Sequence, residues 1–226
     1  MEQTEMTQGG QPQRPSLQSK NISRGFRLPI ATDELLKRIG IEYLRDVRRR
    51  GMEFTNTEML KRQAHEIAEF LVEETDKFGL LICGKVGNGK STMARAIRKV
   101  VNDMVDDGRI TTGERFTWDY LAMVDAREMV RTYIRDYEEE FRLLKSRRYL
   151  IIDDLGTDQT DVMLFGTKFN PFMELLDYRY EHLLPTIIVT NLSASGISEK
   201  YGDPRLPDRM REMFKIIVFE DNSFRK

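Results

Sequence analysis

The sequence is poor in the residue types that build disulfides and zinc sites. Its 226 residues include one cysteine, Cys83, and two histidines, His65 and His182. A single cysteine excludes an intramolecular disulfide and a cysteine-rich zinc site. Cys83 lies in an apolar segment typical of a buried strand, so we interpret it as a small core residue. The histidines fall in separate helical stretches and indicate no metal site.

The sequence also has no excess of charge and no long apolar run. Lys and Arg number 36 and Asp and Glu number 37, which gives a net charge of −1. A nearly neutral chain gives no global sign of nucleic-acid binding, so any basic surface must be local. No apolar run approaches the ~20 residues of a membrane span, and no signal peptide is visible. These absences predict a cytoplasmic protein without a membrane partner.

A glycine-rich loop follows the apolar run Leu80–Cys83 and is the most informative segment of the chain. The loop comprises Gly84, Lys85, Val86, Gly87, Asn88, Gly89, Lys90, Ser91 and Thr92. Its spacing fits the Walker A pattern of nucleotide-binding proteins, in which backbone N–H groups surround phosphate oxygens. Lys90 would reach the β- and γ-phosphates of ATP, and the Ser91 hydroxyl would bind Mg²⁺.

A glycine-rich turn with an unrelated lysine is the alternative to a phosphate-binding loop. The context disfavours this alternative, because apolar residues behind the loop recur at helical spacing. These residues are Met93, Ala94, Ile97, Val100, Val101 and Met104. A strand, a glycine-rich loop and a helix therefore occur in the order that a nucleotide site requires.

Two acidic residues end a second apolar segment, Tyr149–Gly156. Carboxylates at the end of a buried strand are unfavourable unless they face a site. Asp153 lies 153 − 90 = 63 residues after Lys90, with a predicted strand and helix between them, which favours a Walker B role. Asp153 would hold Mg²⁺, usually through water, and Asp154 would orient or deprotonate the attacking water. Either acid could instead be a helix cap or a turn residue.

A third apolar segment, Thr186–Asn191, ends in an amide. Asn191 could hold the attacking water or a γ-phosphate oxygen if this strand lies beside the acidic one. An ordinary turn at the end of a strand explains the asparagine equally well. The residue alone does not decide between these two interpretations.

The order of segments predicts an α/β fold, with a parallel sheet flanked by helices. Residues 1–28 are rich in Gln, Ser, Gly and Pro and predict a disordered arm. Residues 29–55 would form a short helical linker or partner-binding segment, and residues 56–226 the nucleotide-binding domain. Helices are expected over residues 32–50, 56–76, 90–106, 171–183 and 207–213 and after Asp125, and further strands within 116–124 and over 216–219. The helix over 56–76 would begin with the capping box Thr55-Asn-Thr-Glu58.

Two clusters of basic residues and one single arginine are candidates for a DNA surface, although each is more simply explained as solvated charge. They are Arg45–Arg50, the segment Lys145-Ser-Arg147-Arg148, and Arg179. The surrounding charged stretch 135–148 is expected to form a solvated helical face.

Several motifs in sequence order together resemble one protein family. They are the Walker A loop, Asp-Asp-Leu-Gly at 153–156, Pro-Thr-Ile-Ile-Val-Thr-Asn at 185–191, Asp-Arg-Met-Arg at 208–211 and Asp-Asn-Ser-Phe-Arg at 221–225. In combination they resemble the DnaC-type bacterial replicative helicase loaders of the AAA+ ATPases and the related IstB transposition helpers. The resemblance covers residues 56–226. Walker A by itself is generic, whereas the combination is more specific.

The resemblance implies an AAA+ P-loop core that binds ATP and Mg²⁺ and hydrolyses ATP. Asn191 matches the sensor 1 position. Arg209 matches the arginine finger, which acts on ATP held by a neighbouring subunit and so implies self-association through the ATP site. A surface ion pair is the alternative interpretation of Arg209. Arg225 matches an arginine of the family's terminal motif, without an assigned role.

Two departures from the general AAA+ pattern affect these expectations. Only 226 − 209 = 17 residues follow Arg209, so we expect no C-terminal lid domain. Asp154 stands where many AAA+ proteins have glutamate, which implies slow or partner-stimulated hydrolysis.

The function that the resemblance implies is the loading of a replicative DNA helicase onto single-stranded DNA. An IstB-like transposition helper, which binds DNA and a transposase, would have the same ATP chemistry. A nucleotide-gated assembly scaffold with little turnover is a third possibility. A small-molecule P-loop kinase is disfavoured, because it would leave Asn191 and Arg209 unexplained.

Overall fold

A five-stranded parallel sheet forms the centre of the molecule in the computed structural model, which describes residues 25–109 and 120–220. The strand order is β2-β3-β6-β1-β7. The strands are β1 (Gly79–Gly84), β2 (Ala122–Asp125), β3 (Leu150–Leu155), β6 (Thr186–Thr190) and β7 (Phe214–Phe219). The predicted parallel sheet is thereby confirmed.

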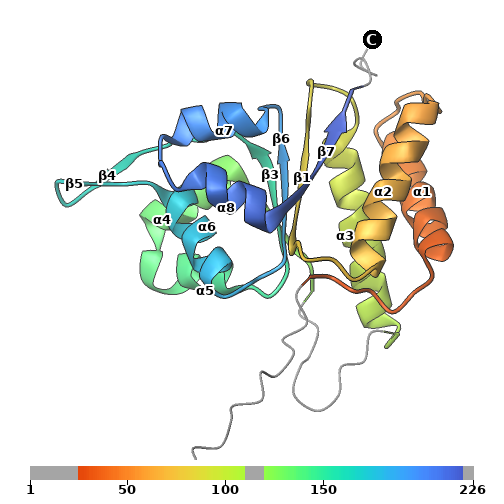
Figure 1. Cartoon of the computed structure of the whole chain (residues 1–226), viewed down its shortest axis with the longest axis horizontal. Coiled ribbons are helices and arrows are strands. Elements are labelled where there is room, and N and C mark those ends of the chain that lie inside the picture. Colours follow the sequence, from red (N-terminus) through yellow and green to blue (C-terminus); the bar gives the residue numbers. More distant parts are fainter. Residues whose placement is uncertain (1–24, 110–119, 221–226) are drawn as a thin grey trace, which may run out of the picture.

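Helices cover both faces of the sheet, as predicted (Figure 1). One face is covered by α1 (Thr32–Arg49), α2 (Glu58–Val72) and α3 (Lys90–Asp106). The other face is covered by α4 (Ala126–Arg135), α5 (Arg142–Ser146), α6 (Pro171–Glu181), α7 (Ala194–Tyr201) and α8 (Leu206–Met213). Among the described residues, no helix is long and apolar enough to cross a membrane.

The central strand β1 shows how a short apolar run specifies this architecture. Leu80 and Ile82 belong to the core between the sheet and α1–α3, whereas Leu81 and Cys83 belong to the core on the other face. Successive side chains in a strand point to opposite faces, so a strand covered on both faces is apolar throughout. Cys83 is buried, as expected of a small core residue.

Two predictions for the N-terminal part of the chain are wrong. Residues 25–28 are not a disordered arm, because Phe26 and Leu28 are buried and the Leu28 amide donates to the Leu71 carbonyl at 2.8 Å. The cap of α2 is Thr57 rather than Thr55, since the Thr57 hydroxyl accepts from the Leu60 amide at 3.0 Å. Residues 1–24 lie outside the described residues, as do residues 116–119 of the predicted second strand and Arg225.

Several elements have no counterpart in the sequence prediction. A hairpin of β4 (Val162–Leu164) and β5 (Thr167–Phe169) follows β3, and α7 follows β6. The stretch 135–148 is only partly a solvated face. It contains a π-helical turn, Tyr137–Phe141, in which Phe141 is fully buried.

Candidate nucleotide-binding site

The glycine-rich loop connects the end of β1 to the start of α3. Gly84, Gly87 and Gly89 have positive φ angles of 140°, 87° and 90°. At Gly84 a Cβ atom would lie 2.2 Å from the backbone oxygen of Phe219 in the neighbouring strand β7. Only glycine fits there. The helix α3 starts directly after Gly89, and the free N–H groups of a helix N-terminus favour an anion.

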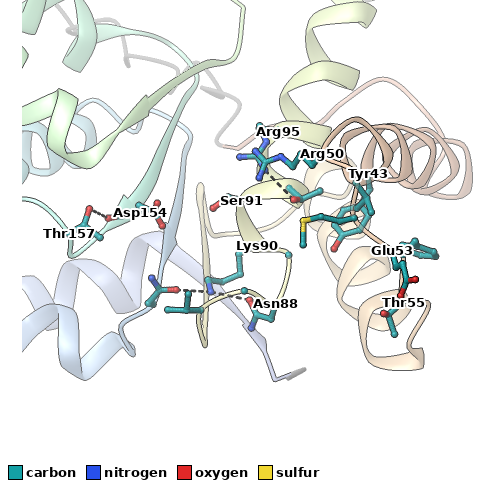
Figure 2. A pocket seen from close by; sticks show the side chains of 18 of the residues that line it. Tyr43, Arg50, Glu53, Thr55, Asn88, Lys90, Ser91, Arg95, Asp154 and Thr157 are labelled. Atoms are coloured by element: carbon teal, nitrogen blue, oxygen red, sulfur yellow. Dashed lines mark hydrogen bonds between the residues drawn. The ribbon is translucent and has the colours of Figure 1, made fainter. Parts of the chain in front are cut away.

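Lys90 is the first residue of α3 and is 5% exposed. Its ammonium donates to the carbonyl oxygens of Gly84 at 2.8 Å and Lys85 at 2.6 Å. It also donates to the side-chain oxygen of Asn88 at 3.0 Å (Figure 2) and to that of Asn191 at 2.9 Å. Four oxygens thus hold the positive charge at the point where phosphate oxygens would replace them.

Ser91 and Asp153 come together from α3 and β3. The Ser91 hydroxyl donates to Asp153 Oδ1 at 2.9 Å. Burial raises the pKa of Asp153, and the hydrogen bond from Ser91 opposes that rise without cancelling it. The described residues contain no cluster of three metal-ligating His, Cys, Asp or Glu side chains. One carboxylate and one hydroxyl, completed by water and phosphate oxygens, form a donor set that suits Mg²⁺.

Asp154 has a backbone conformation that is rare for a residue with a side chain. Its φ angle is 54°, and the pairing of β3 with β6 is irregular between Ile152 and Leu155. The Thr157 hydroxyl holds the Asp154 carbonyl at 2.8 Å. This irregularity directs Asp154 to the pocket, which it lines. Backbone strain of this kind is common at functional sites.

Asn191 follows β6, which lies between β1 and β3 in the sheet. Its contact with Lys90 joins the end of β6 to the loop that follows β1. Because the carboxyl ends of parallel strands share one edge of a sheet, residues from three strands meet at one place. The structure therefore brings together Lys90, Ser91, Asp153 and Asn191, with Asp154 facing the same pocket.

The pocket beside this edge has a volume of about 280 Å³. The loop lines it through Val86, Gly87, Asn88, Gly89, Lys90, Ser91 and Thr92. Its opposite wall comes from α1 and the segment after it, with Tyr43, Val47, Arg50, Met52, Glu53, Phe54 and Thr55. Figure 2 shows that wall on one side and Asp154 and Thr157 on the other, with Lys90 and Ser91 between them.

The sequence prediction missed the wall formed by α1 and three arginines that line the pocket. These are Arg50 after α1, Arg95 on α3 and Arg127 on α4. Arg127 could have been found, because it follows the predicted strand next to β3. Arg95 lies one helical turn after Ser91, which places it near the loop. The contribution of α1 depends on how that helix packs, and no local pattern indicates it.

Comparisons with known proteins agree with this geometry at the level of the fold. No protein-family model matches the sequence, and neither does any curated protein. Among solved structures, the DnaC helicase loader is similar with a TM-score of 0.52 at 18% identity, covering 74% of this chain and 93% of that one. DnaI is similar with a TM-score of 0.52 at 20% identity, covering 84% and 95%. The replication initiator DnaA bound to AMPPCP and single-stranded DNA is similar with a TM-score of 0.51 at 20% identity, covering 76% of this chain and 50% of that chain.

The fold matches that of AAA+ P-loop structures. The expected fold class is therefore confirmed, by the order of its strands and by these structural likenesses. Identities near 20% establish the fold alone, so the role of each residue in this chain is argued from its own geometry.

Arg209 lies in α8, away from the pocket of its own chain. Its guanidinium pairs with Asp177 and lies 5.3 Å from the centre of the Tyr180 ring. The Arg209 side chain is 14% exposed, whereas that of Arg205, four residues earlier, is 61% exposed. Arg205 also approaches Asp177, at 3.6 Å.

Arg179 is neither part of a DNA surface nor the ordinary solvated charge that the sequence favoured, so both interpretations are wrong. Arg179 is fully buried in α6. Its guanidinium donates to the Thr186 hydroxyl at 2.7 Å and to four carbonyl oxygens, those of Lys145, Arg147, Arg148 and Pro185. The four carbonyl groups precede β3 and β6, and Thr186 is the first residue of β6, so Arg179 organises the start of both strands rather than a surface.

Proposed function

We propose that this protein is an ATP-binding and ATP-hydrolysing AAA+ protein of DNA replication, which loads a replicative helicase onto single-stranded DNA. The observation that supports ATP chemistry is the meeting of Lys90, Ser91, Asp153 and Asn191 at the carboxyl edge of the sheet. The fold shared with the DnaC helicase loader and with DnaI supports the role in replication.

Each residue of the site has a distinct proposed role. Lys90 exchanges its carbonyl and amide partners for the β- and γ-phosphate oxygens of ATP. Ser91 and Asp153 hold Mg²⁺, which neutralises phosphate charge when bound. Asp154 orients or deprotonates the attacking water. Asn191 is freed when Lys90 turns to the phosphates, and it then positions the water or a γ-phosphate oxygen.

Arg209 is proposed to act on ATP bound by a neighbouring subunit. In the isolated chain its guanidinium is held by Asp177, so assembly must release it before it can reach another site. Such a requirement links subunit contact to hydrolysis. Arg205 is the alternative finger, because its side chain is more exposed and lies about one helical turn away.

Mixing two inactive variants tests this arrangement. The Lys90→Ala variant has an impaired nucleotide loop but keeps Arg209. The Arg209→Ala variant keeps an intact nucleotide loop but lacks the proposed finger. If Arg209 acts in trans, each variant alone loses about 100-fold or more in turnover and the mixture recovers part of it. Arg205→Ala is the matched control. Normal turnover in Arg209→Ala, together with a loss in Arg205→Ala, would assign the finger to Arg205.

The partner is tested by affinity purification of the tagged protein from its source cell with a non-hydrolysable ATP analogue. We expect recovery of a replicative helicase by the wild-type chain and its loss with Lys90→Ala. Recovery of a transposase instead would favour the IstB-like alternative. A partner recovered equally by both proteins, with no measurable hydrolysis, would favour the nucleotide-gated scaffold.

A further inference from the structure

A second cavity lies between α1 and α3, on the far side of Arg95 from the nucleotide pocket. Its volume is about 430 Å³. It is lined by Glu42, Arg45, Asp46, Arg49, Arg95, Ala96, Arg98, Lys99 and Asn102. We call it the α1–α3 groove. Its lining includes five cationic side chains and two carboxylates, a local charge of +3 in a chain whose net charge is −1.

The polar lining residues follow the same spacing on both helices. On α1 they occupy positions 42, 45, 46 and 49, and on α3 positions 95, 98, 99 and 102. Residues at i, i+3, i+4 and i+7 form one stripe along a helix, so two polar stripes face one another across the groove. Each stripe is about 10 Å long, from a rise of ~1.5 Å per residue. At ~3.4 Å of helix axis per phosphate in one strand, that length spans about three phosphates.

Part of this charge is held by partners within the chain. Asp46 is 9% exposed in its side chain and pairs with Arg49 at 2.6 Å, Arg95 at 3.0 Å and Arg50 at 3.3 Å. One carboxylate cannot neutralise three guanidinium groups, so positive charge remains at this point. Burial works against ionisation of Asp46, but the hydrogen bonds from Arg49 and Arg95 and the charges of Arg95 and Arg50 together outweigh burial and lower its pKa.

Other cations of the groove are accessible from outside. Arg98 is exposed, and within the described residues its guanidinium has no carboxylate within 4.0 Å. Arg45 is 70% exposed in its side chain and Lys99 is 59% exposed, each with one acidic neighbour on its own helix. Arginine forks match the geometry of phosphate oxygens, and exposed intrahelical ion pairs are weak enough to be exchanged.

We propose that the α1–α3 groove binds the phosphate backbone of a nucleic acid. This surface lies outside the ATP site. It would be the surface that contacts the DNA named in the proposed function, so the inference rests on that function. Arg95 lines both cavities and also donates to the Thr92 hydroxyl of the nucleotide loop at 3.1 Å. Backbone binding and ATP binding are therefore linked through a shared side chain, and each ligand changes the affinity for the other.

The test compares two double variants that remove the same charge from different helices. Arg98→Ala/Lys99→Ala alters the groove. Lys61→Ala/Arg62→Ala alters exposed residues of α2, and Lys61, like Lys99, pairs with an acid on its own helix. Binding of a dye-labelled 20-nucleotide single strand and of a duplex of equal length is measured by fluorescence anisotropy from 50 to 200 mM salt.

The groove variant is expected to lose about 10-fold or more in affinity at 50 mM salt and to have a salt slope smaller by about 1 to 2. The α2 variant should match the wild type. The groove variant should lose more affinity for one of the two oligonucleotides. That oligonucleotide, single-stranded or duplex, is then identified as the form of nucleic acid that the groove binds. Unchanged binding by the groove variant, or an equal loss in both variants, overturns the proposal.

Two further measurements keep the result specific. Arg45→Ala/Arg98→Ala removes one cation from each helix and must reproduce the loss, while melting temperatures within about 2 °C show that the variants are folded. If labelled oligoglutamate competes as well as the oligonucleotide, an acidic protein segment is the ligand and the phosphate-backbone proposal is wrong. ATP binding measured in the same samples separates failure of the groove from failure of the ATP site.

Discussion

Lys90 and Arg179 are buried cations at opposite ends of the sheet. Lys90 lies at the carboxyl ends of the strands and is 5% exposed, whereas Arg179 lies where β3 and β6 begin and is fully buried. Both donate to backbone carbonyl oxygens. The difference lies in what surrounds them, because Lys90 lines a pocket and Arg179 is sealed among its acceptors. A buried positive charge is therefore structural at one end of this sheet and available to a ligand at the other.

The strongest test of this comparison is Arg179→Met. Removal of the guanidinium leaves several carbonyl oxygens without a donor, in a place that water cannot easily reach. We expect the free energy of unfolding to fall by about 3 to 5 kcal/mol. Urea unfolding followed by circular dichroism measures the change, with Arg131→Met on the exposed face of α4 as the control. A loss below about 1 kcal/mol would mean that the site is not sealed.

For Lys90→Met, at the carboxyl ends of the strands, we expect the opposite result, namely a small change in stability and a large loss of ATP affinity. Water from the pocket can reach the carbonyl oxygens that Lys90 leaves, so the free energy of unfolding should change by less than about 1 kcal/mol. Affinity for ATP should fall about 100-fold, since a charged hydrogen bond to phosphate contributes ~1.5–3 kcal/mol. Calorimetric titration with ATP and Mg²⁺ measures this loss. A large loss of stability without a change in ATP affinity would reverse the assignment of the two cations.

Asn88 tests how much the hydrogen bonds of the nucleotide loop, at the carboxyl ends of the strands, contribute to the stability of the fold. Its side chain is buried, donates to the Phe219 carbonyl at 2.6 Å and accepts from Lys90. Asn88→Ala should lower the free energy of unfolding by about 2 kcal/mol, because the Phe219 carbonyl loses its buried donor. Denaturant unfolding of the nucleotide-free protein is the measurement, and Asn56→Ala, at an exposed asparagine between α1 and α2, is a control. Equal effects in the two variants would count against a special role for Asn88.

The smallest effect is expected at the partly exposed contact between α1 and α3. The pKa of Asp46 is lower in the folded chain, so its ion pairs stabilise the fold above the ordinary value of 3.8, and this stabilisation is lost as the pH falls through the lowered pKa. Asp46→Asn should therefore destabilise the protein by about 1 kcal/mol at pH 7 and by less near pH 3. Urea titrations at both pH values measure the difference. A destabilisation that stays constant with pH would show that charge is not its cause.

Local patterns were sufficient for the five-stranded sheet, for most of the flanking helices and for the residues at the ends of β1, β3 and β6. The loop at Gly84 and the apolar strand before it form a short contiguous signal, so their structure follows from sequence. The capping residue of α2 was misplaced by two positions, because Thr55 and Thr57 both fit a cap and only packing selects between them. Ser193 caps α7, but that helix buries only Ile197 and Tyr201 and therefore has a weak apolar pattern.

Contacts between distant segments could not be predicted in this way. Arg179 resembled other basic residues in the sequence, and its burial depends on carbonyl groups that α6 meets only after folding. The wall of the pocket formed by Tyr43 and Phe54 depends on the docking of α1, as does the pairing of Asp46 with Arg95. Such features arise from the arrangement of elements rather than from spacing along the chain.

The four oxygens around Lys90 have a consequence for the rate of nucleotide exchange. The loop is already closed around a positive charge, so it does not need to fold when a triphosphate arrives. Arrival should then need no folding step, and its rate should differ little among variants. Differences in affinity would appear in residence time, which makes the lifetime of the bound nucleotide the quantity that a partner protein can regulate.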